Sequence, residues 1–387
     1  MTSRFPDLTV LRRARIAVHL LFLLDGTAIG VWTARIPAVK ERLALGDGQF
    51  SLALFAMACG SIVGMQVVGR LVDRYGSAAV MIPGGALLGL ALIPLAYAPG
   101  LAALSACLFV FGALWGTMNV SMNANAVQVE RGLGRPVMSS FHAFYSVGGF
   151  AGAGLGGLFA HAGIGVGPTF LTAAAALILL AAWSHLWALR TRPEPELRRE
   201  PAARDGNVAR GVLLLGVLGF FCMIGEGAAA DWSSVYLRED LGSSPGFAAT
   251  AYAAFSIMMT AGRLAGDALA ARFGPVALVR CCGLLAGTGL AAALVIGHPV
   301  AGVIGFGCFG AGLSCIVPQV FSAAGHRDPA QAGRALARVA SVGYAGFLLG
   351  PVVIGQAAEL TGLPRALAIP ALLALLVALA APALKPR

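Results

Sequence analysis

Residues 50–98 read FSLALFAMACGSIVGMQVVGRLVDRYGSAAVMIPGGALLGLALIPLAYA, which is two long apolar runs joined by a short loop. Neither run contains a charged residue, whereas the loop carries Arg70, Asp73 and Arg74. A hydrocarbon core about 30 Å thick is spanned by an α-helix of roughly 20 apolar residues. This stretch therefore predicts two membrane-spanning helices connected by a charged turn.

The same pattern recurs along the whole chain of 387 residues. The apolar runs are continuous and do not alternate with a period of two, which excludes a membrane barrel. We predict an all-α membrane protein with twelve transmembrane helices, at residues 16–36, 50–72, 77–98, 101–128, 138–161, 166–189, 211–237, 246–270, 275–297, 300–324, 333–357 and 364–383.

The composition excludes an ordinary soluble enzyme. Charged residues make up 11% of the chain and apolar residues 58%, whereas soluble domains carry about 25% charged residues. The net charge of +10 comes from basic residues in short loops between apolar runs, so we expect no nucleic-acid partner. The seven cysteines lack zinc spacing and are interpreted as packing residues, and neither a metal nor a cofactor is predicted.

The basic residues predict the orientation of the chain. With the N-terminus inside, all but five of the 27 Lys and Arg lie on the cytoplasmic side, and the exceptions are Arg35, Lys40, Arg42, Arg238 and Arg365. This positive-inside bias predicts cytoplasmic N- and C-termini in a multi-pass protein of a bacterial cytoplasmic (inner) membrane.

The chain divides into two similar halves. Residues 190–210 are rich in proline and charge, and are predicted to be a cytoplasmic linker between six-helix bundles at 1–189 and 211–387. Asp25-Gly26 parallels Glu226-Gly227, and Ser146-Val147-Gly148 parallels Ser341-Val342-Gly343. Two pseudo-symmetric six-helix halves are typical of transporters whose halves rock about a central site.

The loop at residues 69–76 resembles a motif of the major facilitator superfamily, G-x-L-x-D-R-x-G, with Gly69, Asp73, Arg74 and Gly76 in the motif positions. The resemblance implies that these residues latch the cytoplasmic side in one conformational state, with Asp73 bonding the positive end of a neighbouring helix. A solvated loop charge pair is the alternative. The second-half copy has Ala271 in place of the acidic residue, so its gating contacts are expected to be weaker, or carried by the Arg263 and Asp267 side chains one helical turn apart.

Finer resemblances point to a branch of the superfamily without naming a substrate. Residues 36–40 and the clustered amides of the fourth segment loosely resemble fucose-permease-like sugar symporters, although the acidic residue expected near those amides is absent. A closer resemblance is to bacterial facilitators whose substrates are not established. The glycine-rich fifth segment resembles, without matching, a motif of drug/proton antiporters.

Two acidic residues lie deep in predicted spans. Asp25 and Glu226 are each about eleven residues from the outer end of a helix, roughly 16 Å from that surface. Ionisable groups at this depth are costly and are functional by default. We interpret both as candidates for proton coupling. The alternative is a structural acid that hydrogen-bonds a neighbouring helix.

Four polar side chains are candidate solute ligands in the fourth and fifth segments. Asn119 and Asn123 are four residues apart and share a helix face, and His142 and Tyr145 are three apart. Amide and imidazole groups suit hydroxyl or carboxylate groups of a solute. Hydrogen bonds between helices are the equally plain alternative.

The remaining candidates lie elsewhere in the second half and at the outer mouth. Trp232 either stacks on a solute or anchors the helix at the membrane interface. Asp231 either forms an outer gate with Arg35 or Arg238, or is simply solvated. In the tenth segment, Pro318-Gln319 is expected to break the helix and offer the Gln319 amide as a ligand.

These features predict a secondary active transporter of a small polar organic solute, sugar-like or an organic acid, working by alternating access. Because no nucleotide-binding motif is present, the energy is expected to come from an ion gradient or from the solute's own gradient. Protons are the expected coupling ion, with sodium as the alternative, since the two deep acids could serve either. Proton-driven efflux of amphipathic drugs or metabolites is the second interpretation, favoured by the glycine-rich fifth segment and 20 phenylalanines. A membrane enzyme and a non-transporting sensor are weaker alternatives. We expect a monomer whose other partner is membrane lipid.

Overall fold

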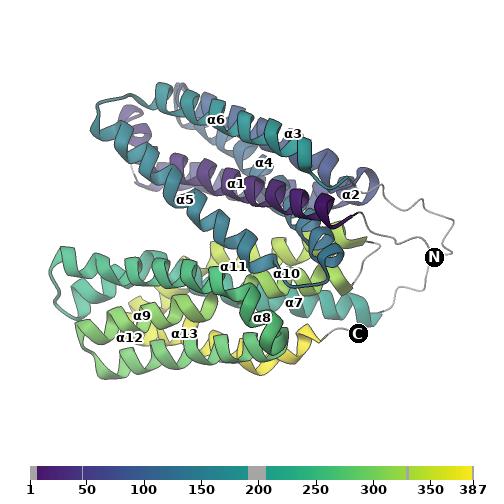
Figure 1. Cartoon of the computed structure of the whole chain (residues 1–387). Coiled ribbons are helices and arrows are strands. Elements are labelled where there is room, and N and C mark those ends of the chain that lie inside the picture. Colours follow the sequence, from purple (N-terminus) through teal and green to yellow (C-terminus); the bar gives the residue numbers. More distant parts are fainter. Residues whose placement is uncertain (1–6, 46, 191–205, 328–330, 386–387) are drawn as a thin grey trace. The chain divides into compact units, whose positions relative to one another are not determined.

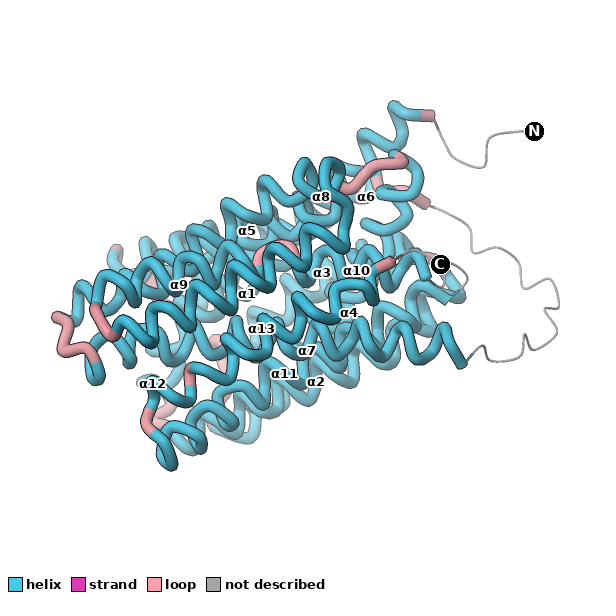
Figure 2. The backbone as a smooth tube through the Cα atoms, turned by 90° about the horizontal axis from the view of Figure 1, so that it is seen from below, coloured by secondary structure: helices cyan, strands magenta, loops and turns pink. Residues whose placement is uncertain are grey.

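The computed structural model describes residues 7–45, 47–190, 206–327 and 331–385. Within these ranges the chain forms helices joined by short turns, and no strand occurs there (Figures 1 and 2). The all-helical class predicted from the apolar runs is confirmed. The predicted linker at residues 190–210 falls mostly in 191–205, which lies outside the described residues.

The first half of the chain forms six long helices. They are α1 (Leu8–Arg42), α2 (Asp47–Tyr75), α3 (Ser77–Leu95), α4 (Leu101–Leu133), α5 (Met138–His161) and α6 (Val166–Trp187). The helix α1 begins eight residues before the predicted span and ends six residues after it. Hydropathy marks only the part of a helix that must be apolar, and the polar ends of α1 continue the helix beyond that part.

The second half forms helices of more uneven length. They are α7 (Gly206–Val235), the π-helical turn η1 (Tyr236–Asp240), α8 (Pro245–Ile296), α9 (Pro299–Leu313), α10 (Ile316–Arg327), α11 (Ala332–Thr361), α12 (Leu363–Ala366), α13 (Ala368–Ala380) and the 3-10 turn η3 (Ala381–Leu384).

The long helix α8 contains two of the predicted spans. Its 52 residues are broken at Gly274, where φ is 76° and ψ is 160°. A straight helix of that length would extend about 78 Å, more than twice the hydrocarbon thickness. A left-handed conformation is open to glycine without strain, so Gly274 turns the chain between the predicted spans at 246–270 and 275–297.

Eleven stretches of the described residues are long and apolar enough to cross a membrane. The number differs from the expected twelve because α8 contains two of the predicted spans, on either side of the kink at Gly274, and counts as one stretch. The helices α9 and α10 belong to a single stretch, Pro299–Arg327.

The expected helix break at Pro318 is wrong. The helix is interrupted earlier, at Ser314 and Cys315, and Pro318 occupies the third position of α10. Proline is tolerated in the first turn because its missing N–H would have no helical partner there. Gln319 therefore lies inside a regular helix and is buried.

The chain separates into two compact units. Unit 1 takes its described residues from Met1–Arg135, Phe141–Arg199 and Pro329–Ala337, and unit 2 from Pro136–Ser140, Glu200–Asp328 and Arg338–Arg387. The first turns of α5 and α11 thus belong to the unit that does not hold the rest of the helix. This exchange brings two acidic side chains to helix N-termini, as described below.

Glycine seams pack the helices inside each unit. In unit 1, Gly148 and Gly152 of α5 lie so close to the backbone of α1 that an added Cβ would clash with a carbonyl oxygen. In unit 2, Gly346 of α11 makes the same approach to the Phe220 carbonyl of α7. Small residues at such interfaces are the usual means of close helix packing in lipid.

A second pair of seams relates the units to each other in sequence. Gly112 of α4 lies against the Met57 carbonyl of α2, and Gly310 of α9 lies against the Phe255 carbonyl of α8. Both members of the second pair are 198 residues beyond those of the first. The internal repeat inferred from sequence is therefore also a repeat of packing contacts, and it gives each position in α2 and α4 a counterpart in α8 and α9.

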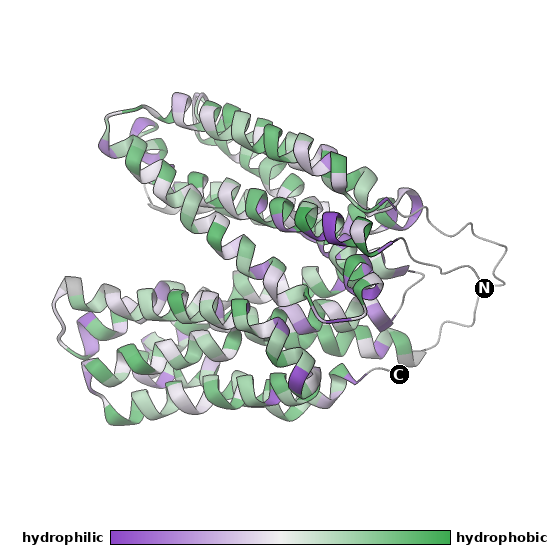
Figure 3. Ribbon diagram, in the orientation of Figure 1, coloured by the Kyte–Doolittle hydropathy of each residue, from purple (hydrophilic) through white to green (hydrophobic). Residues whose placement is uncertain are grey.

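Hydrophilic residues concentrate at one end of the helices in each unit, where α1 begins, α6 ends and α7 begins (Figure 3). Many large apolar side chains along the helices are exposed, including Leu179, Leu186 and Leu379 at 70% or more. An exposed apolar surface of this kind suits contact with lipid chains.

Candidate functional site

Asp25 lies at the centre of α1 and is fully buried in unit 1. The indole Nε1–H of Trp115, on α4, donates a hydrogen bond to its Oδ2 over 3.1 Å. Its Oδ1 is buried without a hydrogen-bond partner among the described residues. A buried carboxylate that faces one neutral donor and no cation is costly, whereas a proton on the carboxyl group removes the charge.

Glu226 lies on α7 in unit 2 and has a cationic partner. The Nη2 atom of Arg263, on α8, is 3.3 Å from Glu226 Oε1, and the two side chains are 9% and 20% exposed for Arg263 and Glu226 respectively. The thiol of Cys222 is 4.0 Å from the same oxygen. This arrangement stabilises the charged carboxylate, since the guanidinium supplies both opposite charge and N–H donors.

Sequence reasoning missed both partners of the acids. The sequence placed Arg263 among the basic residues of the cytoplasmic side. In the structure Arg263 lies within α8 and is buried, with 7% of its surface exposed. By the 198-residue correspondence its counterpart in unit 1 is Met65, and the counterpart of Trp115 is Leu313. By the same correspondence Asp25 falls on Met223, one turn before Glu226, so the two acids lie one turn apart in the repeat. Among the described residues only Glu226 has a cation beside it. A buried arginine at the centre of an apolar helix was the one available signal.

A polar cluster in unit 1 brings together three of the predicted ligands. His142 Nε2 and Asn123 Oδ1 are 3.2 Å apart, and Asn123 Nδ2 donates to the Asn119 carbonyl over 2.7 Å. Asn119 Oδ1 is buried without a hydrogen-bond partner among the described residues. The Phe22 ring meets His142 edge-on at a centroid distance of 5.1 Å. The cluster therefore leaves one amide oxygen unsatisfied beside a histidine.

The other predicted ligands lie outside this cluster. Tyr145 is half-buried on α5, where its carbonyl oxygen is in close contact with Gly26 of α1. Trp232, in unit 2, has a buried indole N–H without a partner among the described residues, and its ring lies against Gly355 of α11. Asn125, two residues after Asn123 on α4, is structural, because its Nδ2 donates to Ser77 Oγ and to the Leu189 carbonyl.

Asp73 binds the N-terminus of α11 within unit 1. Its Oδ1 accepts the Gly333 N–H over 2.8 Å, and its Oδ2 accepts the Arg334 N–H over 3.3 Å. The Arg334 side chain adds an ion-pair contact at 3.6 Å. An added Cβ on Gly69 would be 2.9 Å from the Ala337 side chain, so this glycine permits the approach. The negative charge thus lies where the first N–H groups of a helix need an acceptor.

Asp267 makes the matching contact within unit 2. Its Oδ1 accepts the Ser139 N–H over 2.8 Å and the Ser140 N–H over 3.2 Å at the start of α5. Asp267 lies one turn before Ala271, the position that corresponds to Asp73. The missing acid of the second motif copy is therefore replaced from within α8, as the sequence allowed, and Arg263 instead pairs with Glu226.

The remaining motif and mouth residues are also placed. Gly76 has a φ of 87° and turns the chain between α2 and α3. Arg74 is exposed and lies over the Tyr75 ring at 5.2 Å.

Arg35 is buried and donates to the Ile164 carbonyl over 2.7 Å, which ties α1 to the loop before α6. Asp231 is exposed on α7. In the described part of the chain no three His, Cys, Asp or Glu side chains group as a metal site requires.

Known sequences resemble the whole chain. A family model described as Major Facilitator Superfamily matches residues 16–331 and 215–387. An uncharacterised MFS-type transporter of Yersinia pestis is 37% identical over 377 residues, covering 95% of this chain and 94% of the relative. Transporter y4wD of Sinorhizobium fredii is 34% identical, covering 94% of this chain and 96% of the relative. Membrane protein MosC of Rhizobium meliloti is 30% identical, covering 91% of this chain and 85% of the relative.

Solved structures share the fold at low sequence identity. The transporter FucP, in an outward conformation, aligns with a TM-score of 0.80 at 19% identity, over 96% of this chain and 99% of that chain. The proton:xylose symporter XylE aligns with a TM-score of 0.74 at 13% identity, over 97% of this chain and 95% of that chain. At these identities the likeness establishes the fold alone.

Proposed function

Because the chain belongs to the major facilitator superfamily and is a membrane transporter rather than an enzyme, we propose that it moves a small polar organic solute by proton-coupled alternating access. The solute is sugar-like or an organic acid, and the membrane is a bacterial cytoplasmic membrane, as the bacterial relatives favour. The proposed topology is twelve spans with both termini in the cytoplasm.

The environment of Asp25 is the observation that carries the proton coupling. A proton carrier needs a group whose neutral and charged forms are both reachable, and the membrane interior disfavours the charged form. Asp25 has one oxygen bonded to a neutral indole and one oxygen without a partner. Protonation gives that second oxygen a hydrogen and removes a buried charge, so this acid is suited to bind and release a proton.

Glu226 and Arg263 take a different part in the proposal. The guanidinium holds Glu226 as a carboxylate, so the pair contributes no net charge to the membrane interior. A solute carboxylate would compete with Glu226 for the same guanidinium. The pair is therefore proposed as the polar contact of unit 2 with the solute, while Asp25 binds the proton.

The solute contacts of unit 1 are proposed to come from Asn119, Asn123 and His142. Asn119 Oδ1 is buried without a partner among the described residues and can accept a hydrogen bond from a solute hydroxyl. His142, bonded to Asn123, adds a second polar group at the same place. Solved relatives of the same fold include a fucose:proton symporter and a proton:xylose symporter, which favours a hydroxyl-rich solute.

Alternating access is proposed to use the two helix-cap contacts as paired latches. Asp73 caps α11 and Asp267 caps α5, and both contacts lie at the end of the helices rich in basic residues. Each bond pairs a carboxylate with backbone N–H groups of a helix N-terminus. Breaking and remaking such bonds is a small free-energy change, which suits a carrier that must cycle between states.

One of the two observations that favoured the efflux alternative, the glycine-rich fifth segment, has a partial explanation in packing. Two of the α5 glycines, Gly148 and Gly152, are accounted for by packing, since they meet the backbone of α1.

The test is proton release or uptake when solute is added to the purified protein. A pH-sensitive dye in weak buffer reports protons while sugars, organic acids, amino acids and cationic drugs are added in turn. Wild type is compared with Asp25→Asn and Glu226→Gln, and Asp240→Asn, an exposed carboxyl outside the site, is the matched control. A solute that triggers a proton signal lost only in Asp25→Asn supports the proposal. A solute that binds without any proton signal in wild type rejects proton coupling through this acid.

A further inference from the structure

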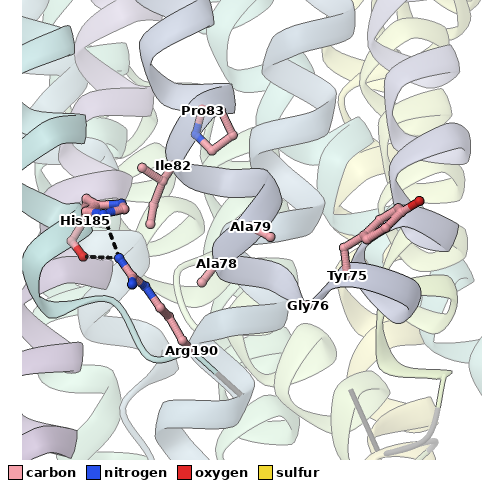
Figure 4. Close-up of a pocket in the computed structure, with 8 residues that line it drawn as sticks. All are labelled: Tyr75, Gly76, Ala78, Ala79, Ile82, Pro83, His185 and Arg190. Atoms are coloured by element: carbon pink, nitrogen blue, oxygen red, sulfur yellow. Dashed lines mark hydrogen bonds between the residues drawn. The ribbon is translucent and has the colours of Figure 1, made fainter. Parts of the chain in front are cut away.

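A small pocket lies at the basic end of unit 1. It has a volume of about 370 Å³ and lies where α2 meets α3, beside the end of α6 (Figure 4). Sites for small ligands have volumes of about 300–1,000 Å³. Its lining residues are Tyr75, Gly76, Ala78, Ala79, Ile82, Pro83, His185 and Arg190.

The pocket combines an apolar wall with a cationic edge. Ala79, Ile82 and Pro83 of α3 form the wall, and His185 and Arg190 face it from the end of α6 (Figure 4). Arg190 Nη2 is 2.7 Å from His185 Nε2 and 3.2 Å from the His185 carbonyl. A guanidinium has five N–H donors, so donors remain for a ligand. No lining residue is acidic.

The neighbouring residues place the pocket at the level of lipid headgroups. The Trp183 and Trp187 rings of α6 pack at a centroid distance of 5.4 Å, one turn or less from His185, and Trp183 is 49% exposed. Tryptophan is enriched at the boundary between lipid and water. The same end of the unit carries Arg70 and Arg74 on α2. The pocket is therefore open at an apolar surface and electrically positive.

The start of α3 adds donors to the positive edge. The residue before the helix is Gly76, which provides no side-chain cap. The hydroxyl of Ser77 donates to Gln128 Oε1 and accepts from Asn125, so it is engaged with α4. Gly76 thus supplies no side-chain acceptor to the first N–H groups of α3, which begins beside a pocket that already presents Arg190.

We propose that this pocket binds the phosphate group of an anionic phospholipid, with the lipid glycerol and upper acyl chain lying along the α3 wall. Phosphate suits a guanidinium, which donates two parallel hydrogen bonds to it. Free inorganic phosphate offers the same chemistry but has no apolar part for the Ile82 and Pro83 surface. The wall and the membrane level therefore favour the lipid as the source.

The experiment measures lipid affinity of the full chain by native mass spectrometry from detergent. Phosphatidylglycerol is titrated against wild type, Arg190→Gln and Arg280→Gln, with phosphatidylcholine as the neutral-headgroup lipid. Arg280 is exposed on α8 and outside the pocket, so it carries the same charge change as a matched control. A fourth variant, Ala79→Phe, fills the pocket without changing charge, and the exposed position of Ala79 tolerates the larger ring.

Wild type is expected to bind phosphatidylglycerol more tightly than phosphatidylcholine. Arg190→Gln should weaken phosphatidylglycerol binding about tenfold, as loss of a charge-assisted contact does. Ala79→Phe should weaken it as well, and Arg280→Gln should leave it unchanged. Equal losses in Arg190→Gln and Arg280→Gln, or equal binding of the two lipids, would overturn the proposal. Displacement of phosphatidylglycerol from wild type by inorganic phosphate would assign the pocket to a soluble anion instead.

Discussion

Replacing Asp25 by Asn should abolish proton-driven accumulation of solute but preserve exchange of that solute across the membrane. Asparagine has the size of aspartate, and its carbonyl oxygen can keep the 3.1 Å bond from Trp115 Nε1. Its amide would occupy the place of Oδ1, which has no partner among the described residues. The variant therefore resembles an acid that is always protonated, and it can carry solute without carrying a proton.

The expected size of the effect follows from one titrating acid. One elementary charge moving through 100 mV gives about 2.3 kcal/mol, which corresponds to an accumulation ratio of about 50 at 1.36 kcal/mol per decade. Asp25→Asn should bring this ratio to about 1. The bond from Trp115 becomes one between neutral groups, worth roughly 0.5–1.5 kcal/mol, so the variant should fold and purify as wild type does.

The assay uses proteoliposomes with an imposed membrane potential and a radiolabelled solute identified in the proton-release screen. Accumulation is measured first, and counterflow into vesicles preloaded with unlabelled solute is measured second. Asp240→Asn makes the same chemical change at an exposed residue and should behave as wild type in both measurements.

Two results would refute the reasoning. Accumulation at the wild-type ratio in Asp25→Asn would mean that the driving proton binds elsewhere. Loss of counterflow together with accumulation would mean that Asp25 holds the solute or the fold, because a carrier that mimics the protonated acid should still exchange.

Three further predictions concern contacts within the units. Arg263→Met should lower the free energy of unfolding by about 3 kcal/mol, because it leaves the Glu226 carboxylate without its cation. Reversible unfolding in denaturing detergent measures this change, and an unchanged unfolding midpoint would contradict the ion pair. Asp73→Ala and Asp267→Ala should each cost about 1 kcal/mol as lost helix caps, and the double variant should sum the two in the same assay. An effect of one that vanishes in the presence of the other would contradict separate latches. Gly152→Ala should destabilise the protein by roughly 1–3 kcal/mol, because the added Cβ meets the α1 backbone. Gly154→Ala, where the added Cβ has open space, should not. Equal thermal midpoints for the two variants would contradict close packing of α5 on α1 at Gly152.

The membrane-spanning helices were predictable because each must present about 20 apolar residues, a constraint that a single sequence displays directly. The helix ends were not, since polar turns such as those around Arg12 and Arg42 obey no such constraint and are helical nonetheless. In α8 the sequence predicted two separate spans, and the turn at Gly274 that separates them lies inside one helical element.

Asp25 and Glu226 stood out in the sequence as acids within apolar runs, but their partners could not be read from it. Trp115 is 90 residues from Asp25 and Arg263 is 37 from Glu226, and neither pairing has a local pattern. Helix packing decides which side chains meet, and it depends on seams of glycines whose partners are equally remote. Asp267 was named as a substitute for the missing acid at Ala271, yet its target, the N-terminus of α5, depends on tertiary packing.

The unequal partners of the two acids have a consequence for stoichiometry on the proposed mechanism. If both Asp25 and Glu226 released their protons in each cycle, two charges would move and the accumulation ratio at 100 mV would approach about 2,500, the square of the one-proton value. The guanidinium of Arg263 opposes this, because protonating Glu226 would leave an uncompensated cation in the membrane interior. Among the described residues Asp25 has no such cation beside it, so its proton is the one that can come and go. For an uncharged solute, a ratio near 50 is the value that this asymmetry predicts.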